Sequence, residues 1–185
     1  MKARCGIPSA SNFDKIITTK GEPSKQREKY MYQLAAEAVT GVKEESYQNA
    51  AMTRGIEMEA EARQFYELTN NVEVEQVGFC LEDTGLYGAS PDGLVNSDGL
   101  VEIKCPQSQT HVSYMIKGGL DTEYYQQLQG QLLVTGRRYV DIISYFPGLK
   151  PMIIRVVRDE KFLKALRVEL DVFCIELQDV IRKIK

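Results

Sequence analysis

Apolar residues along this chain recur either at every third or fourth position or at every second position, and the two spacings predict helices and strands respectively. The first helical stretch follows Ser24, a residue type that caps helix starts, and ends at Gly41, which tolerates the left-handed backbone common after helices. The same spacing predicts three further helices, at 47–68, 107–117 and 122–135. A long amphipathic helix is expected from Asp159 onward, and its apolar stripe comprises Phe162, Leu166, Leu170, Phe173, Leu177, Ile181 and Ile184.

Strand-like segments bounded by Gly and Asn/Asp turns fill the stretches between these helices. They lie at 77–81, 86–89, 93–95, 100–105, 139–146 and 152–157. Strands interleaved with helices favour an α/β fold, in which helices flank a central mixed β-sheet on both sides. A chain of 185 residues is long enough for one proper core and short for two, so we expect a single domain over 1–185.

Charged residues interrupt the otherwise apolar strand expected at 100–105. Strand alternation puts Glu102 and Lys104 on one face, whereas Val101, Ile103 and Cys105 form an apolar face suited to the core. An acid and an ammonium group inside an apolar strand indicate a functional site. The alternative is a structural ion pair between the two, which stabilises a fold little.

Asp92 joins this charged face only if the preceding hairpin has the right register. A three-residue loop at 96–98 would pair Val95 with Gly99 and set Asp92 opposite Glu102, with Gly99 taking the positive φ of a G1 bulge. A four-residue loop would turn Asp92 to the opposite face. We expect the shorter loop.

Another acid, Glu59, lies within the helix expected at 47–68. It falls on the stripe that should pack inward, where a carboxylate is costly unless it is paired or bound to a metal. Gly55, one turn earlier, would allow close approach of another backbone. The remaining members of the stripe are Ile56, Ala62 and Tyr66.

Oxygen ligands of this kind suit Mg²⁺ or Mn²⁺ rather than zinc. A pair of such ions clamps the attacking and leaving oxygens of a phosphodiester. In that scheme Asp92 touches both ions, Glu102 and the carbonyl of Ile103 hold one, and Glu59 adds a further carboxylate. Lys104 would orient or deprotonate the attacking water, or stabilise developing charge.

Composition limits the classes of protein that remain. Hydrophobic content of 43% and charged content of 26% are ordinary globular values, so disordered and fibrous classes are disfavoured. The four cysteines lack metal-type or disulfide-type spacing, and the first residues do not look like a signal peptide, so we expect a reduced, cytoplasmic protein without membrane segments. The net charge of −3 argues weakly against nucleic-acid binding, although an acidic metal site lowers the total by itself.

Pro91-Asp92 followed by Glu102-Ile-Lys104 resembles the PD-(D/E)xK nuclease superfamily and its restriction-endonuclease-like core. More narrowly, nearly the whole chain resembles the phage-type alkaline exonucleases, the YqaJ-like viral recombinases of the lambda exonuclease type. That resemblance implies a Mg²⁺-dependent 5′→3′ exonuclease that degrades one strand of linear double-stranded DNA to 5′-mononucleotides. It further implies a ring-shaped homotrimer in the cytoplasm of a bacterial host, which leaves a 3′ single strand for a single-strand annealing protein.

The resemblance also assigns residues outside the hairpin. Arg4 and Ser11 match a segment that binds the DNA 5′-phosphate, and Ser90 either binds the same phosphate or shapes the turn before Pro91. The helix with Glu59 matches the one that supplies an extra acid. Gln127-Leu-Gln129 matches a glutamine pair; residues two apart cannot share a helix face, and Gln127 is our choice for the site.

One departure from the family pattern concerns the phosphate pocket. Relatives have an arginine in the stretch that corresponds to 108–111, where this chain has Ser-Gln-Thr-His. The pocket is therefore either less basic here or completed by Lys117.

Other functions remain open at this stage. The same core serves endonucleases and repair or CRISPR-associated nucleases, although the scattered cysteines do not suit an iron–sulfur type. A non-catalytic DNA-binding subunit would have lost a metal ligand, and none is missing. The basic residues of the C-terminal third either line a DNA channel or form a solvated face; they are Lys150, Arg155, Arg158, Lys161 and Lys164.

Overall fold

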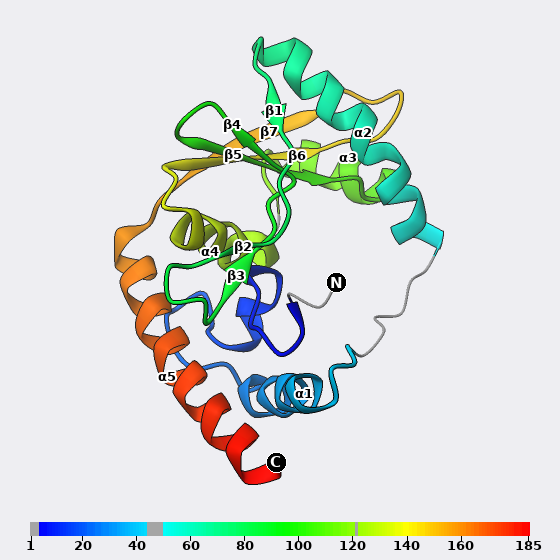
Figure 1. The fold of residues 1–185 in the computed structure, drawn as a ribbon. Helices are drawn as coiled ribbons and strands as arrows, with labels where there is room; N and C mark the ends of the chain where they lie inside the picture. Colours follow the sequence, from blue (N-terminus) through cyan, green and yellow to red (C-terminus); the bar gives the residue numbers. More distant parts are fainter. Residues whose placement is uncertain (1–3, 44–49, 121) are drawn as a thin grey trace.

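The computed structural model describes residues 4–43, 50–120 and 122–185 (Figure 1). Its helices are α1 (Arg27–Thr40), α2 (Ala50–Asn70), α3 (Ser108–Lys117), α4 (Tyr125–Thr135) and α5 (Glu160–Ile184), with short 3₁₀ helices η2 (Ala10–Lys15) and η3 (Thr122–Tyr124). Its strands are β1 (Val74–Glu75), β2 (Cys80–Leu81), β3 (Gly88–Ala89), β4 (Gly93–Val95), β5 (Gly99–Lys104), β6 (Tyr139–Ser144) and β7 (Met152–Val157). None of the helices, in the part of the chain described, has the length and apolar character needed to cross a membrane.

Five strands form one mixed sheet in the order β1-β4-β5-β6-β7. Only β5 and β6 run parallel, and the other neighbours are antiparallel. A parallel pair needs a crossover connection, and α3 and α4 provide it between β5 and β6. The expected α/β architecture with a mixed sheet is confirmed, and β2 and β3 form a separate two-stranded sheet.

Helices cover both faces of the five-stranded sheet (Figure 1). On one face, Ala62 and Tyr66 of α2 pack against Val101 and Ile103 of β5. On the other face α4 packs against β5 and β6, through a cluster formed by Leu100, Leu128, Leu132, Val140 and Ile142. The alternation predicted for β5 is therefore confirmed, because Val101 and Ile103 lie in one cluster and Leu100 lies in the other.

A third apolar cluster lies away from the five-stranded sheet, among η2, α1, α5 and β3. The stripe expected on α5 supplies much of it, and its members from Phe162 to Ile181 are buried, whereas Ile184 is 52% exposed. The left-handed Gly41 ends α1, as expected. The expected start of α2 at 47 lies outside the described residues.

Some boundaries differ from the sequence-based expectation. Ser24 does not cap α1: the cap position is Gln26, whose N–H donates to the Ser24 hydroxyl at 3.3 Å, so the serine closes a turn before the helix instead. The strands expected at 77–81 and 86–89 are each only two residues long. β1 was not expected, because two paired residues leave no periodic pattern in the sequence.

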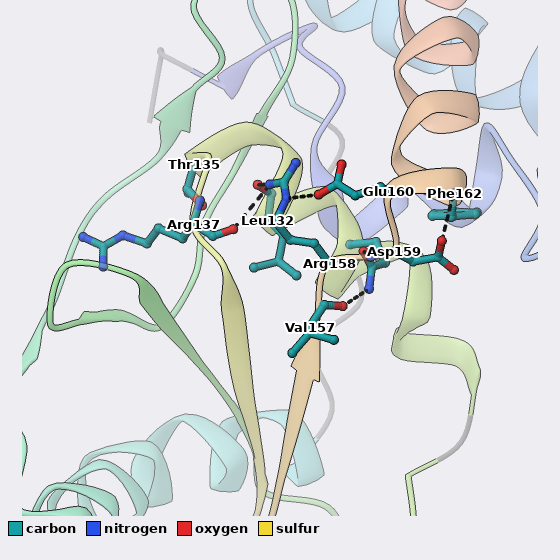
Figure 2. Close-up of polar contacts among 9 residues, drawn as sticks. Leu132, Thr135, Arg137, Val157, Arg158, Asp159, Glu160 and Phe162 are labelled. Carbon is teal, nitrogen blue, oxygen red and sulfur yellow. Dashed lines mark hydrogen bonds and ion pairs between the residues drawn. The ribbon is translucent and has the colours of Figure 1, made fainter.

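Polar contacts fix the junction between β7 and α5 (Figure 2). The Asp159 carboxylate accepts a hydrogen bond from the Phe162 N–H at 3.0 Å and so caps α5. Gln129 of α4 donates to the Val157 carbonyl and accepts from the Asp159 N–H, both at 2.9 Å. Arg158 donates to the Leu132 carbonyl at 2.7 Å, so α4 is tied to this junction at two points.

A close contact between α4 and η2 sets the position of α4. Gly130 of α4 faces the ring of Phe13, and a methyl group at Gly130 would lie 2.5 Å from Phe13 Cδ2. Side-chain carbon atoms do not approach so closely. α4 is thus held between the sheet on one side and the N-terminal segment on the other.

This contact predicts opposite effects for two helical glycines. Alanine favours a helix over glycine by about 1 kcal/mol, but Gly130→Ala places its methyl group against Phe13, and we expect the free energy of unfolding to fall by about 1–3 kcal/mol. At Gly55 the nearest atom to an added methyl is the Cys105 carbonyl oxygen at 3.8 Å, so Gly55→Ala should raise stability by up to about 1 kcal/mol. Urea denaturation measures both, and equal effects would contradict this account of α4.

Candidate active site

The hairpin that carries Asp92 has the shorter of the two loops considered. Val95 pairs with Gly99 and Gly93 pairs with Val101, so three residues form the loop, as expected. The G1 bulge is wrong, however: Asn96 takes the positive φ, at 49°, and Gly99 does not. Gly99 is needed for another reason, because any side chain there would collide with the ring of Tyr139.

Asp92 lies just beyond the point where the pairing of β4 with β5 ends. Its N–H donates to the Val101 carbonyl at 3.1 Å, and its Oδ2 accepts from the Ile103 N–H at 2.6 Å. Because the N–H and C=O of one strand residue point to the same side, the Ile103 carbonyl is also directed toward Asp92. The Asp92 carboxylate and the Ile103 carbonyl therefore lie on the same edge of β5.

Burial and nearby negative charge raise the pKa of Asp92 to about 7. Burial is the larger cause, followed by the Glu102 carboxylate and then Glu59, while the Ile103 N–H and Lys104 act in the opposite direction. Ionisation of Asp92 is therefore unfavourable in its present surroundings, chiefly because the carboxyl is buried. A cation nearby would stabilise the ionised form of such a buried carboxyl group.

Glu102 is 3% exposed and has hydrogen bonds to both carboxylate oxygens. Lys104 Nζ donates to Oε1 at 2.7 Å, and Gln127 Nε2 donates to the same oxygen at 2.6 Å. Gln131 Nε2 donates to Oε2 at 2.6 Å. The ion pair between Glu102 and Lys104 considered above is present, but it is one of three contacts that hold this buried carboxylate.

Lys104 is half-buried and is held on several sides. Besides Glu102, its Nζ approaches Gln127 Oε1 at 3.4 Å and lies 4.9 Å from the centroid of the Tyr124 ring. These contacts point the ammonium group along the charged face of β5. Tyr124 therefore contributes a ring contact within the site, whereas Tyr125 packs on Phe162 at 4.7 Å between ring centroids.

The four glutamines of α4 contact three different regions, and Gln126 donates to the Ile17 carbonyl at 3.3 Å. Gln127 and Gln131 are one helical turn apart and both reach Glu102. Gln129 faces the junction with α5 instead. Sequence reasoning missed Gln131, although the four-residue spacing from Gln127 was available as a signal.

Glu59 lies closer to the surface than the other acids. Its side chain is 33% exposed and pairs with Arg63 Nη2 at 2.5 Å, while Ala62 on the same helix is fully buried. Its charge contributes to the raised pKa of Asp92, so it lies near the site. The expectation that Gly55 allows a close backbone approach is wrong, because an added methyl group there would meet only an ordinary contact.

The donor set can be compared with the needs of a divalent cation. Within 4–43, 50–120 and 122–185, no group of three or more Asp, Glu, His or Cys side chains is arranged to hold a metal ion. Asp92, Glu102 and the Ile103 carbonyl nevertheless supply three oxygen donors, two of them acidic. Mg²⁺ commonly takes one or two carboxylates and keeps several waters, so these residues fit Mg²⁺ or Mn²⁺.

A polar pocket of about 80 Å³ lies in the N-terminal segment, and its lining residues include Arg4, Ser11 and Lys43. Arg4 donates to the Ser90 hydroxyl and lies 4.9 Å from the centroid of the Phe79 ring. Since Ser90 precedes Asp92 by two residues, this contact joins the pocket to the hairpin. The three residues assigned to phosphate binding by resemblance are thus brought to one region.

Other contacts near this pocket bear on the sequence-based expectations. Ser90 also donates to the Gly78 carbonyl at 3.3 Å, which ties the residue before Pro91 to the segment before β2. The described lining includes Lys43 and does not include Lys117. Buried Glu37 is a further lining residue, and it accepts hydrogen bonds from the Gly6 N–H and from Gln33.

Several remaining polar residues have structural partners. His111 is fully buried between the Ser144 hydroxyl, at 2.7 Å from Nδ1, and the Lys150 carbonyl, at 3.1 Å from Nε2. Arg155 makes two hydrogen bonds of 2.8 Å to Asp141, and Arg158 pairs with Glu160 (Figure 2). Part of the basic C-terminal group therefore supports the fold.

A protein family and several solved structures are similar to this chain. The family model of the YqaJ-like viral recombinase domain matches residues 1–138. The structure of the alkaline exonuclease LHK-Exo from Laribacter hongkongensis is 35% identical, with a TM-score of 0.89 over 98% of this chain and 93% of that chain. LHK-Exo in complex with dAMP matches with a TM-score of 0.90 and 35% identity, covering 100% and 94% of the two chains.

A more distant structure shares the fold. The phage related exonuclease from Haemophilus somnus 129PT is 13% identical, with a TM-score of 0.75 over 97% of this chain and 96% of that chain. Comparison with curated protein sequences returns no match. The family match and the likeness to LHK-Exo lead to one conclusion: the chain belongs to the YqaJ-like viral recombinase family and is a nuclease that acts on DNA.

Proposed function

We propose that this nuclease is a Mg²⁺-dependent 5′→3′ exonuclease. It removes 5′-mononucleotides from one strand of linear double-stranded DNA and leaves a 3′ single strand for recombination by strand annealing. The observation that carries the proposal is the convergence of Asp92, Glu102 and Lys104 at one end of β5. The contact of Arg4 with Ser90 connects that end to a pocket suited to a terminal phosphate.

Asp92, Glu102 and the Ile103 carbonyl would hold the metal, and Glu59 lies near enough to contribute to a second ion once it leaves Arg63. When bound, Mg²⁺ would neutralise phosphate charge and lower the pKa of a bound water. Lys104 has three N–H donors and no acceptor. It would therefore stabilise charge on the reacting phosphate and orient water, while Gln127 contacts both Lys104 and Glu102.

The phosphate pocket supports the proposed polarity. Arg4 offers a planar group of donors that matches a phosphate, and the hydroxyls of Ser11 and Ser90 add further donors. Lys43 supplies a second positive charge at the pocket, in the role that an arginine near 108–111 takes in relatives. LHK-Exo also has a structure in complex with dAMP, which is the kind of mononucleotide that the proposed reaction releases with either polarity.

Substitution of Asp92 tests the metal site. We expect Asp92→Asn to lower Mg²⁺-dependent nucleotide release by at least about a thousandfold, since several kcal/mol of transition-state stabilisation would be lost. Mg²⁺ should raise the melting temperature of the unaltered protein and not that of this variant. Asp98→Asn, in the loop of the same hairpin and paired with Arg138, is the matched control and should behave like the unaltered protein.

Substitution of Arg4 tests whether the pocket binds the 5′-terminal phosphate of DNA. The unaltered protein should degrade 5′-phosphorylated linear duplex faster than 5′-hydroxyl duplex, and Arg4→Ala should remove about 10- to 100-fold of that preference, as expected for lost hydrogen bonds to a charged group. Arg138→Ala, whose side chain is 80% exposed, should leave the preference unchanged. Rates are measured on duplexes that differ only at the 5′ end.

Closed-circular duplex separates the proposal from its alternative, an endonuclease or a repair or CRISPR-associated nuclease of the same fold. An exonuclease needs an end and leaves the circle intact. Degradation of the circle at a rate near that of the linear form would contradict the proposed activity.

The resemblance also leads us to propose a homotrimer that passes its single-stranded product to an annealing protein. Three apolar side chains on α3, Val112, Met115 and Ile116, are exposed, and such surface is suited to subunit contacts. The particle mass in solution should equal three times the 20.9 kDa of one chain. A mass of one chain at micromolar concentration would refute this assembly.

A further inference from the structure

The two oxygens of Glu102 have partners of different kinds. Oε1 accepts from Lys104 and Gln127, which are both partly exposed. Oε2 accepts only from Gln131 among the contacts of the described residues, and Gln131 is 1% exposed. One oxygen therefore faces side chains that have room to move, and the other faces an enclosed one.

Gln131 is an unusual residue for its place in the fold. It lies on α4 one turn beyond Gln127 and between Leu128 and Leu132, which pack against the sheet. Its own Oε1 is buried and has no hydrogen-bond partner among the described residues. A buried amide oxygen without a partner destabilises the fold, so the bond from Nε2 to Glu102 is retained at a cost.

The backbone of α4 prevents Gln131 from following a shift of Glu102. Gly130 is pressed against Phe13 on one side, and Gln129 ties the same turn to the junction between β7 and α5 on the other. Lys104 and Gln127 are instead partly exposed, and the side-chain contacts that hold their ends are to each other, to Glu102 and to the Tyr124 ring. A cation can displace them from Oε1 while Oε2 stays in place.

We propose that Gln131 is a positioning residue for the metal ligand Glu102, fixing Oε2 so that Oε1 is presented to a divalent cation. The inference rests on the metal site proposed above. Partners that orient a metal ligand in this way commonly change metal affinity by about 10- to 100-fold when they are removed. A purely structural role would change stability and leave metal affinity alone.

The test is Mn²⁺ binding to the whole protein without DNA, measured by calorimetry. Gln131→Met keeps the side-chain length and removes the donor, and Gln131→Leu, which resembles the neighbouring leucines, is the second variant should the first fold poorly. We expect Mn²⁺ to bind either variant about 10- to 100-fold more weakly. The KM for DNA should stay within about twofold of the unaltered value, and saturating Mg²⁺ should restore much of kcat, since only metal affinity is affected.

Gln129→Met is the matched control, because Gln129 is equally buried on the same helix and holds only the α5 junction. It should lower stability and leave Mn²⁺ affinity unchanged. Unaltered Mn²⁺ affinity in the Gln131 variants, beside clear binding by the unaltered protein, would overturn the inference and leave the proposed function standing. Failure of the unaltered protein to bind Mn²⁺ would overturn both.

Discussion

The site depends on one constraint, the forced proximity of two carboxylates where the pairing of β4 with β5 ends. Glu102 lies within β5. Asp92, which directly precedes β4, lies across the hairpin and accepts a hydrogen bond from the Ile103 N–H. Burying like charges together is unfavourable. Donors from Lys104 and α4 satisfy Glu102, but Asp92 keeps a raised pKa. A cation beside Asp92 would favour its ionised form, and the proposed metal site supplies one.

Much of this arrangement was predictable from local patterns. The side chains of a strand alternate with a period of two, so a hairpin that buries Val101 and Ile103 has one loop length that also brings Asp92 beside Glu102. The apolar stripe of α5 was equally predictable, because its members recur at helical spacing. By contrast, β1, β2 and β3 are each two residues long, which is too short to leave a periodic pattern in the sequence. Ser24 closes a turn before α1 and does not cap the helix.

One part of the site that escaped prediction comes from tertiary packing, and two follow from helix geometry. Lys43 lines the same pocket as Arg4, although 38 residues lie between the two in the sequence. The pairing of Glu59 with Arg63 was missed, although an acid followed four residues later by an arginine on one helix commonly forms such a pair. The family resemblance points to Gln127 and Gln129 and not to Gln131. Helix geometry nevertheless places Gln127 and Gln131, four residues apart, on one face.

The contact between Gly130 and Phe13 has a consequence for how this family varies. The helix that carries Gln127 and Gln131 rests on a ring supplied by the N-terminal segment, with no space left between them. A bulkier residue at 130 is tolerated only beside a smaller one at 13, so the two positions should change together among related proteins. The segment around Phe13 is therefore part of the scaffold that supports the candidate site, and we expect the two to vary together.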